Sequence, residues 1–292
     1  MKKIKGIILA GGNGSRLYPL THGTSKQLLP VYDKPMIYYP LSILMLAEIR
    51  DILIITTNQD LSKFKNLLGD GKKLGLNINY ETQQNPNGIA ESFIIGSDFI
   101  ENDDVSLILG DNIFHGVNFM SNIEIAKENL VSGFSTIFGV EVENPKNFGV
   151  IEFDQNLSVS KIVEKPPKPK SNTIVSGMYF YTNEVIRVAN NLTPSQRGEK
   201  EITDINNFFL KKNKLKLSLL DNNTSWIDTG TYSSLIRASK FFEDIETQTG
   251  KKVSCIEEIA YEMNYIDDAQ LLKIAESMKN SEYGKYLFNL IK

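Results

Sequence analysis

The chain has 292 residues, of which 41% are hydrophobic and 23% are charged, so it can bury a substantial core and is not compositionally disordered. Its net charge of −3 argues against a general nucleic-acid-binding protein, because such proteins usually carry a basic surplus. The single cysteine, Cys255, excludes an intramolecular disulfide, and no apolar run is long enough to span a membrane. We therefore expect a cytoplasmic protein without nucleic-acid or membrane partners.

The first half of the chain alternates short apolar segments with amphipathic ones. We predict strands over 4–9, 51–56, 77–82 and 105–109, and helices over 36–47, 61–68 and 89–99. This alternation predicts a parallel sheet covered by helices, and the near-continuous apolar character of the strands indicates that both of their faces are buried. The expected fold class is therefore α/β with a mainly parallel central sheet.

The second half changes character. Segments 149–153 and 159–163 predict a β-hairpin, 175–181 a strand, and 201–209 a helix. The basic, proline-rich segment 165–170 is interpreted as an exposed loop within one domain rather than a linker. From residue 232 onward we predict helices over 232–245, 255–262, 267–277 and 283–291, a helical region that is a candidate for subunit contacts.

A glycine-rich turn follows the first predicted strand. Gly11, Gly12 and Gly14 let the backbone approach a phosphate closely, and Arg16 adds a planar cation that suits phosphate oxygens. The turn is neither a P-loop, because no Gly-Lys-Ser/Thr follows, nor a Gly-x-Gly-x-x-Gly dinucleotide site, because position 16 is Arg. Alone it leaves phosphate binding and a simple turn open, whereas Lys26 shortly after it favours a ligand with several negative charges.

Two aspartates predict a metal site. Asp111 follows an apolar strand, and ligands of open α/β sheets bind at such strand ends. Asp228 is a second such carboxylate, and two carboxylates with phosphate oxygens suit Mg²⁺, although either aspartate alone is more often a cap or turn residue. Zinc is disfavoured because the chain has only His22, His115 and one cysteine. His115 is a candidate base, but a lone histidine is usually structural.

Several strings occur in the order of a known family. They are Gly11-Gly12-Asn13-Gly14-Ser15-Arg16, Ser25-Lys26-Gln27-Leu28-Leu29-Pro30, Lys34-Pro35-Met36-Ile37-Tyr38-Tyr39, Gly110-Asp111-Asn112, Glu164-Lys165-Pro166, Glu201-Ile202-Thr203-Asp204-Ile205-Asn206 and Trp226-Ile227-Asp228-Thr229-Gly230. By these strings the chain, from about Lys5 to its C-terminus, resembles the glucose-1-phosphate thymidylyltransferases, a branch of the sugar nucleotidyltransferases that supplies dTDP-rhamnose synthesis.

The resemblance implies an architecture. We expect a Rossmann-like three-layer α/β/α fold with a β-hairpin excursion and a nucleotidyltransferase core over 1–230. Its nucleotide-binding half would span about 1–115 and its sugar-binding half about 116–230. The helical region 231–292 would mediate contacts in a homotetramer.

The resemblance also implies a reaction: transfer of a thymidylyl group from dTTP to α-D-glucose 1-phosphate, with Mg²⁺ as cofactor and pyrophosphate as leaving group. The residues implied as catalytic are Arg16, Lys26, Asp111 and Asp228, of which Asp111 and Asp228 would hold the metal. The residues implied in nucleotide binding are Gly11, Gly12, Gly14, Ser15, Arg16, Lys26, Gln27, Gln83 and Gly88. The residues implied in sugar-phosphate binding are Asn112, Gly149, Glu164, Lys165 and Val175.

Some positions depart from the family pattern. Ser15 replaces a common Thr, Asn87 stands where Asp is usual, Glu91 where Gln is usual, and Phe148 and His115 where Tyr is expected. These departures leave open a UTP-dependent enzyme or one that uses another sugar 1-phosphate. A dinucleotide-dependent dehydrogenase is disfavoured by the arginine at position 16. A non-catalytic nucleotide sensor is disfavoured by the intact set of four implied catalytic residues.

Overall fold

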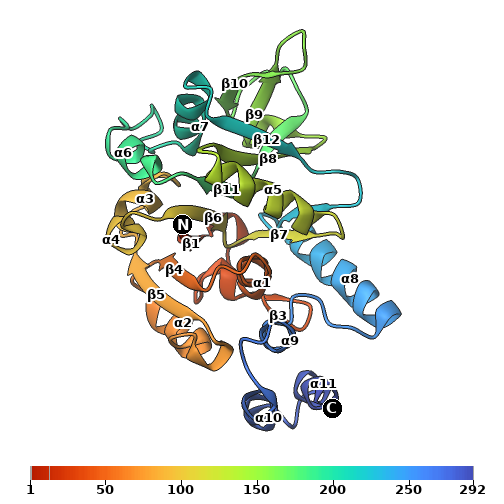
Figure 1. Ribbon diagram of the computed structural model, residues 1–292. Helices are drawn as coiled ribbons and strands as arrows, with labels where there is room; N and C mark the ends of the chain where they lie inside the picture. Colours follow the sequence, from red (N-terminus) through yellow and green to blue (C-terminus); the bar gives the residue numbers. More distant parts are fainter. Residues whose placement is uncertain (1, 13, 292) are drawn as a thin grey trace.

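Alternate residues of the buried strands pack into two different apolar cores, one on each face of a central sheet. On strand β1 (Ile4–Ala10), Ile8 and Ala10 belong to one core and Ile7 and Leu9 to the other. In the computed structural model, which describes residues 2–12 and 14–291, helices cover both faces of this sheet (Figure 1). This arrangement confirms the three-layer α/β/α fold.

Within the described part of the chain the central sheet has nine strands, with a main path ordered β10-β9-β11-β6-β1-β4-β5 and with β8 and β12 branching from β11. Pairs β1–β4, β1–β6, β4–β5 and β8–β12 are parallel, whereas β11 runs antiparallel to β6, β8 and β9. The remaining strands of this sheet are β4 (Asp51–Thr56), β5 (Asn77–Thr82), β6 (Asp104–Leu109), β8 (Ser135–Glu141), β9 (Gly149–Phe153), β10 (Val159–Glu164), β11 (Thr173–Tyr181) and β12 (Leu215–Leu219). The predicted hairpin is the antiparallel pair β9–β10. The loop after it returns to β11 of the same sheet, as expected for a loop within one domain.

Two small antiparallel sheets lie off the main one. They are β2 (Pro30–Val31) with β3 (Lys34–Pro35), and β7 (Asn112–His115) with β13 (Ser225–Asp228). The second sheet places Asp228 opposite Asn112. It therefore brings the end of the core sequence back to the segment that follows β6.

Three helices contribute to the core that contains Ile8: α1 (Tyr38–Leu46), α2 (Leu61–Leu68) and α5 (Phe119–Val131). Four helices contribute to the core that contains Ile7: α3 (Glu91–Ile95), α4 (Ser97–Ile100), α6 (Glu184–Asn190) and α7 (Ile202–Lys211). The single helix predicted over 89–99 was wrong, because the chain forms α3 and α4 with a break at Gly96. A Cβ on Gly96 would lie 3.1 Å from the Ile7 side chain, so a glycine lets this segment pack closely on β1. Among the described residues, no helix is both long and apolar enough to cross a membrane.

The C-terminal helices are α8 (Tyr232–Thr249), α9 (Ile256–Glu262), α10 (Asp268–Ser277) and α11 (Glu282–Leu290). Thr231 and Asp267 begin α8 and α10 with reciprocal capping boxes, which satisfy free backbone N–H groups of the first turn. Ile256, Leu271 and Leu287 are buried in the same apolar core as α1 and the sheet. The helical region is thus packed onto the rest of the chain.

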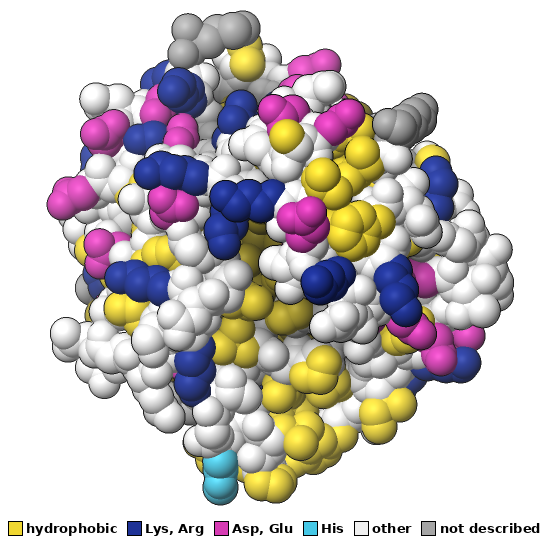
Figure 2. All heavy atoms as spheres, turned by 90° about the horizontal axis from the view of Figure 1, so that it is seen from below, with side chains coloured by type: hydrophobic (Ala, Val, Ile, Leu, Met, Phe, Trp, Pro, Cys, Tyr) yellow, Lys and Arg dark blue, Asp and Glu magenta, His cyan; other side chains and the backbone are white. Residues whose placement is uncertain are grey.

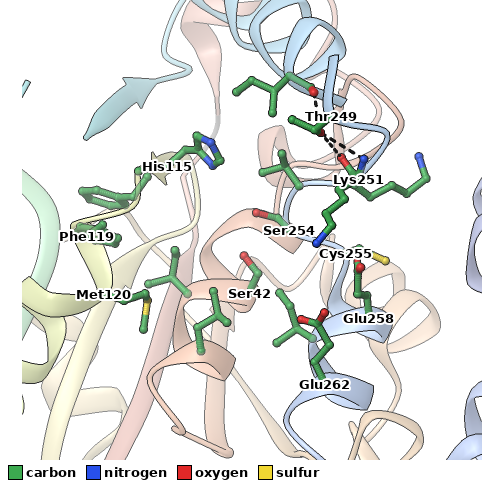
Figure 3. A pocket seen from close by; sticks show the side chains of 18 residues that line it. Ser42, His115, Phe119, Met120, Thr249, Lys251, Ser254, Cys255, Glu258 and Glu262 are labelled. Carbon is green, nitrogen blue, oxygen red and sulfur yellow. Dashed lines mark hydrogen bonds between the residues drawn. The ribbon is translucent and has the colours of Figure 1, made fainter. Parts of the chain in front are cut away.

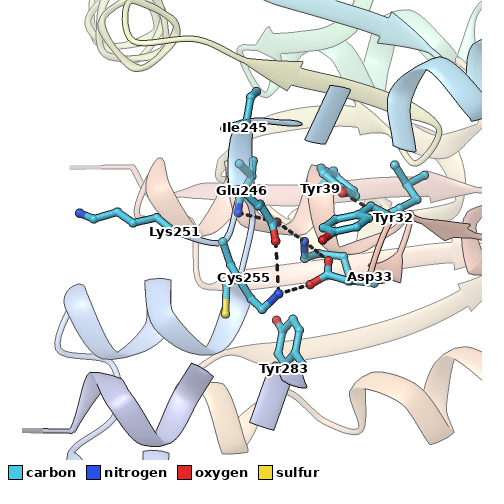
Figure 4. Close-up of polar contacts among 12 residues, drawn as sticks. Tyr32, Asp33, Tyr39, Ile245, Glu246, Lys251, Cys255 and Tyr283 are labelled. Atoms are coloured by element: carbon cyan, nitrogen blue, oxygen red, sulfur yellow. Dashed lines mark hydrogen bonds and ion pairs between the residues drawn. The ribbon is translucent and has the colours of Figure 1, made fainter. Parts of the chain in front are cut away.

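A buried charge network also ties this region to β3. Lys34 forms ion pairs with Asp33 and with Glu246 of α8, whose carboxylate lies 3.0 Å from the lysine Nζ. Lys252 pairs with the same two carboxylates. Figure 4 shows Asp33 and Glu246 in this network of dashed contacts. The Val253 backbone N–H donates to Glu246 at 2.9 Å, so the segment after α8 is held by the same group.

Candidate active site

The turn after β1 has the backbone shape that its glycines allow. Gly12 has φ +101° and Gly14 has φ +56°, conformations that residues with a Cβ rarely adopt. A Cβ on Gly14 would also lie 3.0 Å from Thr21, whose hydroxyl donates to the Gly14 carbonyl at 2.8 Å. We call residues 11, 12 and 14–16 the glycine loop. Its last residue, Arg16, lies in a short 3₁₀ helix, Ser15–Leu17, which follows the glycines.

Lys26 lies between the two predicted metal ligands. It is only 6% exposed, and its Nζ is 2.6 Å from Asp111 Oδ2 and 3.9 Å from Asp228 Oδ1. Asp111 follows β6, as expected for a ligand site at the end of a parallel strand. Asp228 does not follow a strand of that sheet, contrary to expectation: it ends β13, which pairs antiparallel with β7. The small sheet, rather than the large one, therefore brings the two carboxylates together.

The two carboxylates of this cluster lie beside a single close ammonium group, that of Lys26. Burial opposes ionisation of Asp111, but the adjacent Lys26 ammonium and the Asn112 amide hold the pKa of Asp111 below its ordinary value. Burial and the charge of Asp111 raise the pKa of Asp228, against the smaller opposing effects of Lys26 and Arg16. Two neighbouring carboxylates that share one close ammonium favour a further cation, and carboxylate oxygens are the ligands that Mg²⁺ prefers. Asp111 and Asp228 thus fit a magnesium site completed by waters or phosphate oxygens.

Two cavities meet at this cluster. The glycine-loop cavity has a volume of 210 Å³ and the hairpin cavity one of 200 Å³, and both are lined by Arg16 and Asp111. The glycine-loop cavity is further lined by Gly11, Gly12, Gly14, Ser15, Leu17, Lys26, Gln27 and Gly230. Ligands in the two cavities would therefore both lie beside Arg16 and Asp111.

The hairpin cavity collects the five residues predicted to bind the sugar phosphate. It is lined by Asn112, Gly149, Glu164, Lys165 and Val175, together with Phe148, Tyr179, Glu199, Glu201, Thr203, Trp226 and Asp228. Its walls combine aromatic rings with hydrogen-bonding groups, a combination that suits a sugar ring with an apolar face and hydroxyl edges.

Sequence reasoning missed Trp226 and Thr203, which line this cavity, and Arg197, which pairs with the lining residue Glu164. Trp226 Nε1 donates to Asn112 Oδ1 at 2.7 Å, and the Thr203 hydroxyl donates to Glu164 Oε2 at 2.5 Å. Arg197 Nη1 lies 3.4 Å from Glu164 Oε1. The half-exposed Lys165 pairs with the same carboxylate oxygen, so two cations lie beside Glu164. The string around Trp226 and the one that contains Thr203 were both noted as family strings, so they already carried a signal. Arg197 had none in our sequence analysis.

Of the two residues predicted to read the base, Gln83 lies beside the glycine loop and Gly88 lies next to Gln83. Gln83 follows β5 and is 7% exposed, and its Oε1 is 3.0 Å from the position that a Cβ on Gly11 would take. Its Nε2 donates to the Gly88 carbonyl at 3.2 Å. Gly88 has φ +105°, and a Cβ there would lie 2.3 Å from the Lys200 carbonyl oxygen. Only a glycine fits that contact without displacing the chain.

His115 lies in a different place from the predicted catalytic residues. It lines a third cavity of 430 Å³ between α1, α8 and α9, where Figure 3 shows it with Phe119, Met120 and Cys255. Burial lowers the pKa of His115, and its ring packs at 5.9 Å from Phe242. Among the described residues, those that line the glycine-loop and hairpin cavities do not include His115. The structure thus supports a packing role rather than that of a catalytic base.

The fold and the two connected cavities define a nucleotidyltransferase. The chain belongs to the nucleotidyl transferase family, whose model matches residues 5–245. Named relatives give the particular type. The chain is 48% identical over 289 residues to the glucose-1-phosphate thymidylyltransferase of Neisseria meningitidis, covering 99% of this chain and 100% of the relative. It is 49% identical to that of Mycobacterium tuberculosis and 50% identical to that of Xanthomonas campestris, with at least 98% of each chain covered.

Solved structures agree with this relationship. The chain is 39% identical to a candidate glucose-1-phosphate thymidylyltransferase from Bacillus anthracis, solved in complex with sucrose, with a TM-score of 0.76 over 82% of this chain and 95% of that one. A UDP-glucose pyrophosphorylase in complex with UDP-glucose is 23% identical with a TM-score of 0.73, covering 83% of this chain and 100% of that one. At that identity the second likeness shows a shared fold.

Proposed function

We propose that this chain transfers the thymidylyl group of dTTP to glucose 1-phosphate, forming dTDP-glucose and pyrophosphate. The observation that carries the proposal is the junction of the two cavities at Arg16 and Asp111. A triphosphate on the glycine loop and a sugar phosphate in the hairpin cavity would meet there. The full-length relatives that share the name glucose-1-phosphate thymidylyltransferase support the identity of both substrates.

The proposed reaction is a single displacement. An oxygen of the sugar 1-phosphate forms a bond to the α-phosphorus of dTTP, and the bond from that phosphorus to the bridging β-phosphate oxygen breaks, so that pyrophosphate leaves. A phosphate monoester is already nucleophilic, so the chain needs no general base, in keeping with the distant position of His115. Its task is to align the two phosphates and to offset their charge.

Named residues would carry out this task. Arg16 and Lys26 would stabilise the charge that develops on the triphosphate, and Lys165 would hold the attacking phosphate. Asp111 and Asp228 would hold Mg²⁺, which supplies positive charge to the phosphate oxygens. Within the described residues, no cluster of three or more potential metal ligands competes with this pair.

We also propose that the helical region 231–292 mediates self-association, to a homotetramer. Tyr232 and Ile236 on α8 and Leu272 on α10 are exposed, at 44%, 69% and 40%. Figure 2, seen from the side of α10 and α11, shows hydrophobic side chains gathered beside charges of both signs. Light scattering would test this assignment, because a monomer at micromolar concentration would contradict it. The cytoplasmic location stays a prediction from the sequence.

The test of the proposed activity is a comparison of nucleotides. Purified protein, Mg²⁺ and glucose 1-phosphate are mixed with dTTP, UTP, ATP or GTP at equal concentration, and pyrophosphate release is followed. We expect dTTP to be preferred, UTP to be used less well, and purine nucleotides to be poor substrates. A preference for ATP, or no pyrophosphate with any nucleotide, would contradict the proposal.

A further inference from the structure

The amide of Gln83 has a fixed orientation. Its Nε2 donates to Glu91 Oε2 at 2.7 Å and to the Gly88 carbonyl at 3.2 Å. A carboxylate and a carbonyl only accept hydrogen bonds, so both require the NH₂ end of the amide on their side. Turning the amide over would set its oxygen against two acceptors. The NH₂ end therefore faces the loop of residues 83–88, and the oxygen faces away from it.

Glu91 is itself held in place for this contact. Its other oxygen, Oε1, accepts from Asn87 Nδ2 at 2.8 Å, so both carboxylate oxygens are engaged by amides. The loop that carries Asn87 is anchored in turn, because the Lys200 N–H donates to the Asn87 carbonyl at 2.7 Å. Hydrogen bonds to an ionised acceptor are roughly twice as strong as neutral ones. The link from Glu91 to Gln83 is thus the strongest one that this amide makes.

The free end of the amide points at Gly11 of the glycine loop. Gln83 Oε1 lies 3.0 Å from the position of a Cβ on Gly11, and Gly11 lines the glycine-loop cavity. Within residues 2–12 and 14–291, no donor reaches Oε1, although Gln83 is only 7% exposed. Gln83 thus places a hydrogen-bond acceptor of set direction beside Gly11.

We propose that Glu91 is a positioning residue that sets base selectivity by holding the acceptor end of Gln83 toward the nucleotide. Position 3 of a thymine or uracil ring is an N–H donor, which this oxygen can accept. The same ring position of cytosine is an acceptor, which faces Gln83 Oε1 without a proton between them. The proposal rests on the proposed function for the site, and it adds a reason why cytidine nucleotides are rejected.

The experiment compares dTTP with dCTP in the wild-type enzyme and in Glu91→Met, which keeps the size of the side chain but removes its acceptors. Without the carboxylate, the Gln83 amide can rotate and present its NH₂ group to cytosine. We expect the ratio of kcat/KM for dTTP to that for dCTP to fall at least about tenfold, a change of about 1.4 kcal/mol. The KM for glucose 1-phosphate should stay unchanged, because the sugar phosphate lies in the other cavity.

Two further variants separate positioning from general damage. Glu91→Gln keeps an acceptor for Gln83. Its ratio of kcat/KM for dTTP to that for dCTP should therefore stay within about threefold of the wild-type ratio, a free-energy change less than half that of a tenfold loss. Asp98→Asn, an exposed acidic residue on the next helix, should leave selectivity unchanged. An unchanged dTTP-to-dCTP ratio in Glu91→Met, or a loss as large in Glu91→Gln, would overturn the proposal.

A binding measurement distinguishes this proposal from the proposed function. Calorimetry with dTTP and with dCTP, each with Mg²⁺ and without sugar phosphate, reports base selectivity even if the enzyme uses another acceptor. A wild-type preference for dTTP that is lost in Glu91→Met would support Glu91 whatever the outcome of the turnover assay. Equal binding of dTTP and dCTP by the wild-type protein would refute the role of Glu91, and activity with dTTP would leave the proposed function standing.

Discussion

Lys26 Nζ and Asp111 Oδ2 lie 2.6 Å apart, although 85 residues separate them in the chain. Before substrates bind, this lysine is the nearest cation to a pair of carboxylates that repel each other. If a triphosphate binds on the glycine loop as proposed, Lys26 would be able to exchange carboxylate oxygens for phosphate oxygens without leaving the site. The contact explains how a lysine can be buried in this cleft and still be available to the nucleotide.

The first prediction concerns the metal ligands. Asp111→Asn and Asp228→Asn should each lower kcat about 100-fold or more while the fold is retained, because each removes a charge that holds the cation at the reacting phosphates. Pyrophosphate release measured across a magnesium titration checks this, with circular dichroism as the control for folding. Near wild-type activity of either variant at limiting Mg²⁺ would show that the ligand assignment is wrong.

The second prediction separates the two lysines. Lys26→Ala should chiefly lower kcat, because Lys26 lies beside Asp111, where charge would develop in the transition state of the proposed reaction. Lys165→Ala should raise the KM for glucose 1-phosphate more than the KM for dTTP, because Lys165 lines the hairpin cavity and not the glycine-loop cavity. Steady-state kinetics with each substrate varied in turn provide the measurement. Equal changes in both KM values for Lys165→Ala would count against this division.

Much of the fold could be predicted where one physical signal dominates. Strand β4 matches its predicted bounds because it is a largely apolar run. Strand β5 matches because exposed polar residues alternate along it with the buried Ile78 and the half-buried Tyr80, contrary to the expectation that both faces of each strand are buried. Strand β8 was missed, because it begins with Ser135 and Thr136, which are fully buried polar residues without a strand-like pattern of their own. Strand β13 was missed because it has only four residues. The antiparallel direction of β11 depends on the path of the chain and is not carried by its local sequence.

The site was predictable as a set of residues but not as a geometry. The glycine loop could be predicted from its three closely spaced glycines, and the family resemblance predicted the sugar-phosphate residues that line the hairpin cavity. The pairing of β7 with β13, which places Asp228 beside Asn112, joins segments more than a hundred residues apart, and no spacing rule predicts it. The orientation of Gln83 depends on Glu91, a residue that stood out only as a departure from the family pattern.

A third prediction concerns Gly88. Gly88→Ala should raise the KM for dTTP about tenfold or more, because a Cβ at φ +105° would lie 2.3 Å from the Lys200 carbonyl oxygen and push the loop away from Gln83. Gly133→Ala is the matched control: it has φ +81°, but no described atom lies within 4 Å of its added Cβ. That control should cost about 1–2 kcal/mol of stability through backbone strain alone and leave the KM unchanged. Similar KM values for both variants would contradict the proposed contact.

A fourth prediction concerns the buried charge network at α8. Glu246→Ala should lower the free energy of unfolding by about 3–5 kcal/mol, because it leaves the 3%-exposed Lys34 ammonium with one carboxylate fewer in an apolar setting. The control is Lys240→Ala on the same helix, whose ion pairs with Glu243 and Asp244 are exposed to solvent. We expect little change there, because solvent screens such pairs. Urea denaturation gives both values, and equal stability losses would show that burial of the network is unimportant.

The last prediction follows from a buried carboxyl group in α9. Burial raises the pKa of Glu257 above its ordinary value, against the opposing effect of the Tyr283 hydroxyl, which donates to Oε2 at 2.6 Å. The folded state therefore binds this proton more tightly than the unfolded state. The stability that comes from protonation is complete below the ordinary pKa of 4.5 and is lost as the pH rises through the folded-state value.

Glu257→Gln keeps an acceptor for Tyr283 but carries no charge at any pH. Its Tm should exceed that of the wild type at pH 8, and the difference should shrink toward zero as the pH falls to about 4.5. Thermal melts across this range provide the measurement, with Glu262→Gln, on the exposed side of the same helix, expected to match the wild type throughout. A wild type that is more stable than Glu257→Gln at pH 8 would mean that the charged carboxylate is favourably paired in the fold, with the charge of Lys34 as the source of that pairing.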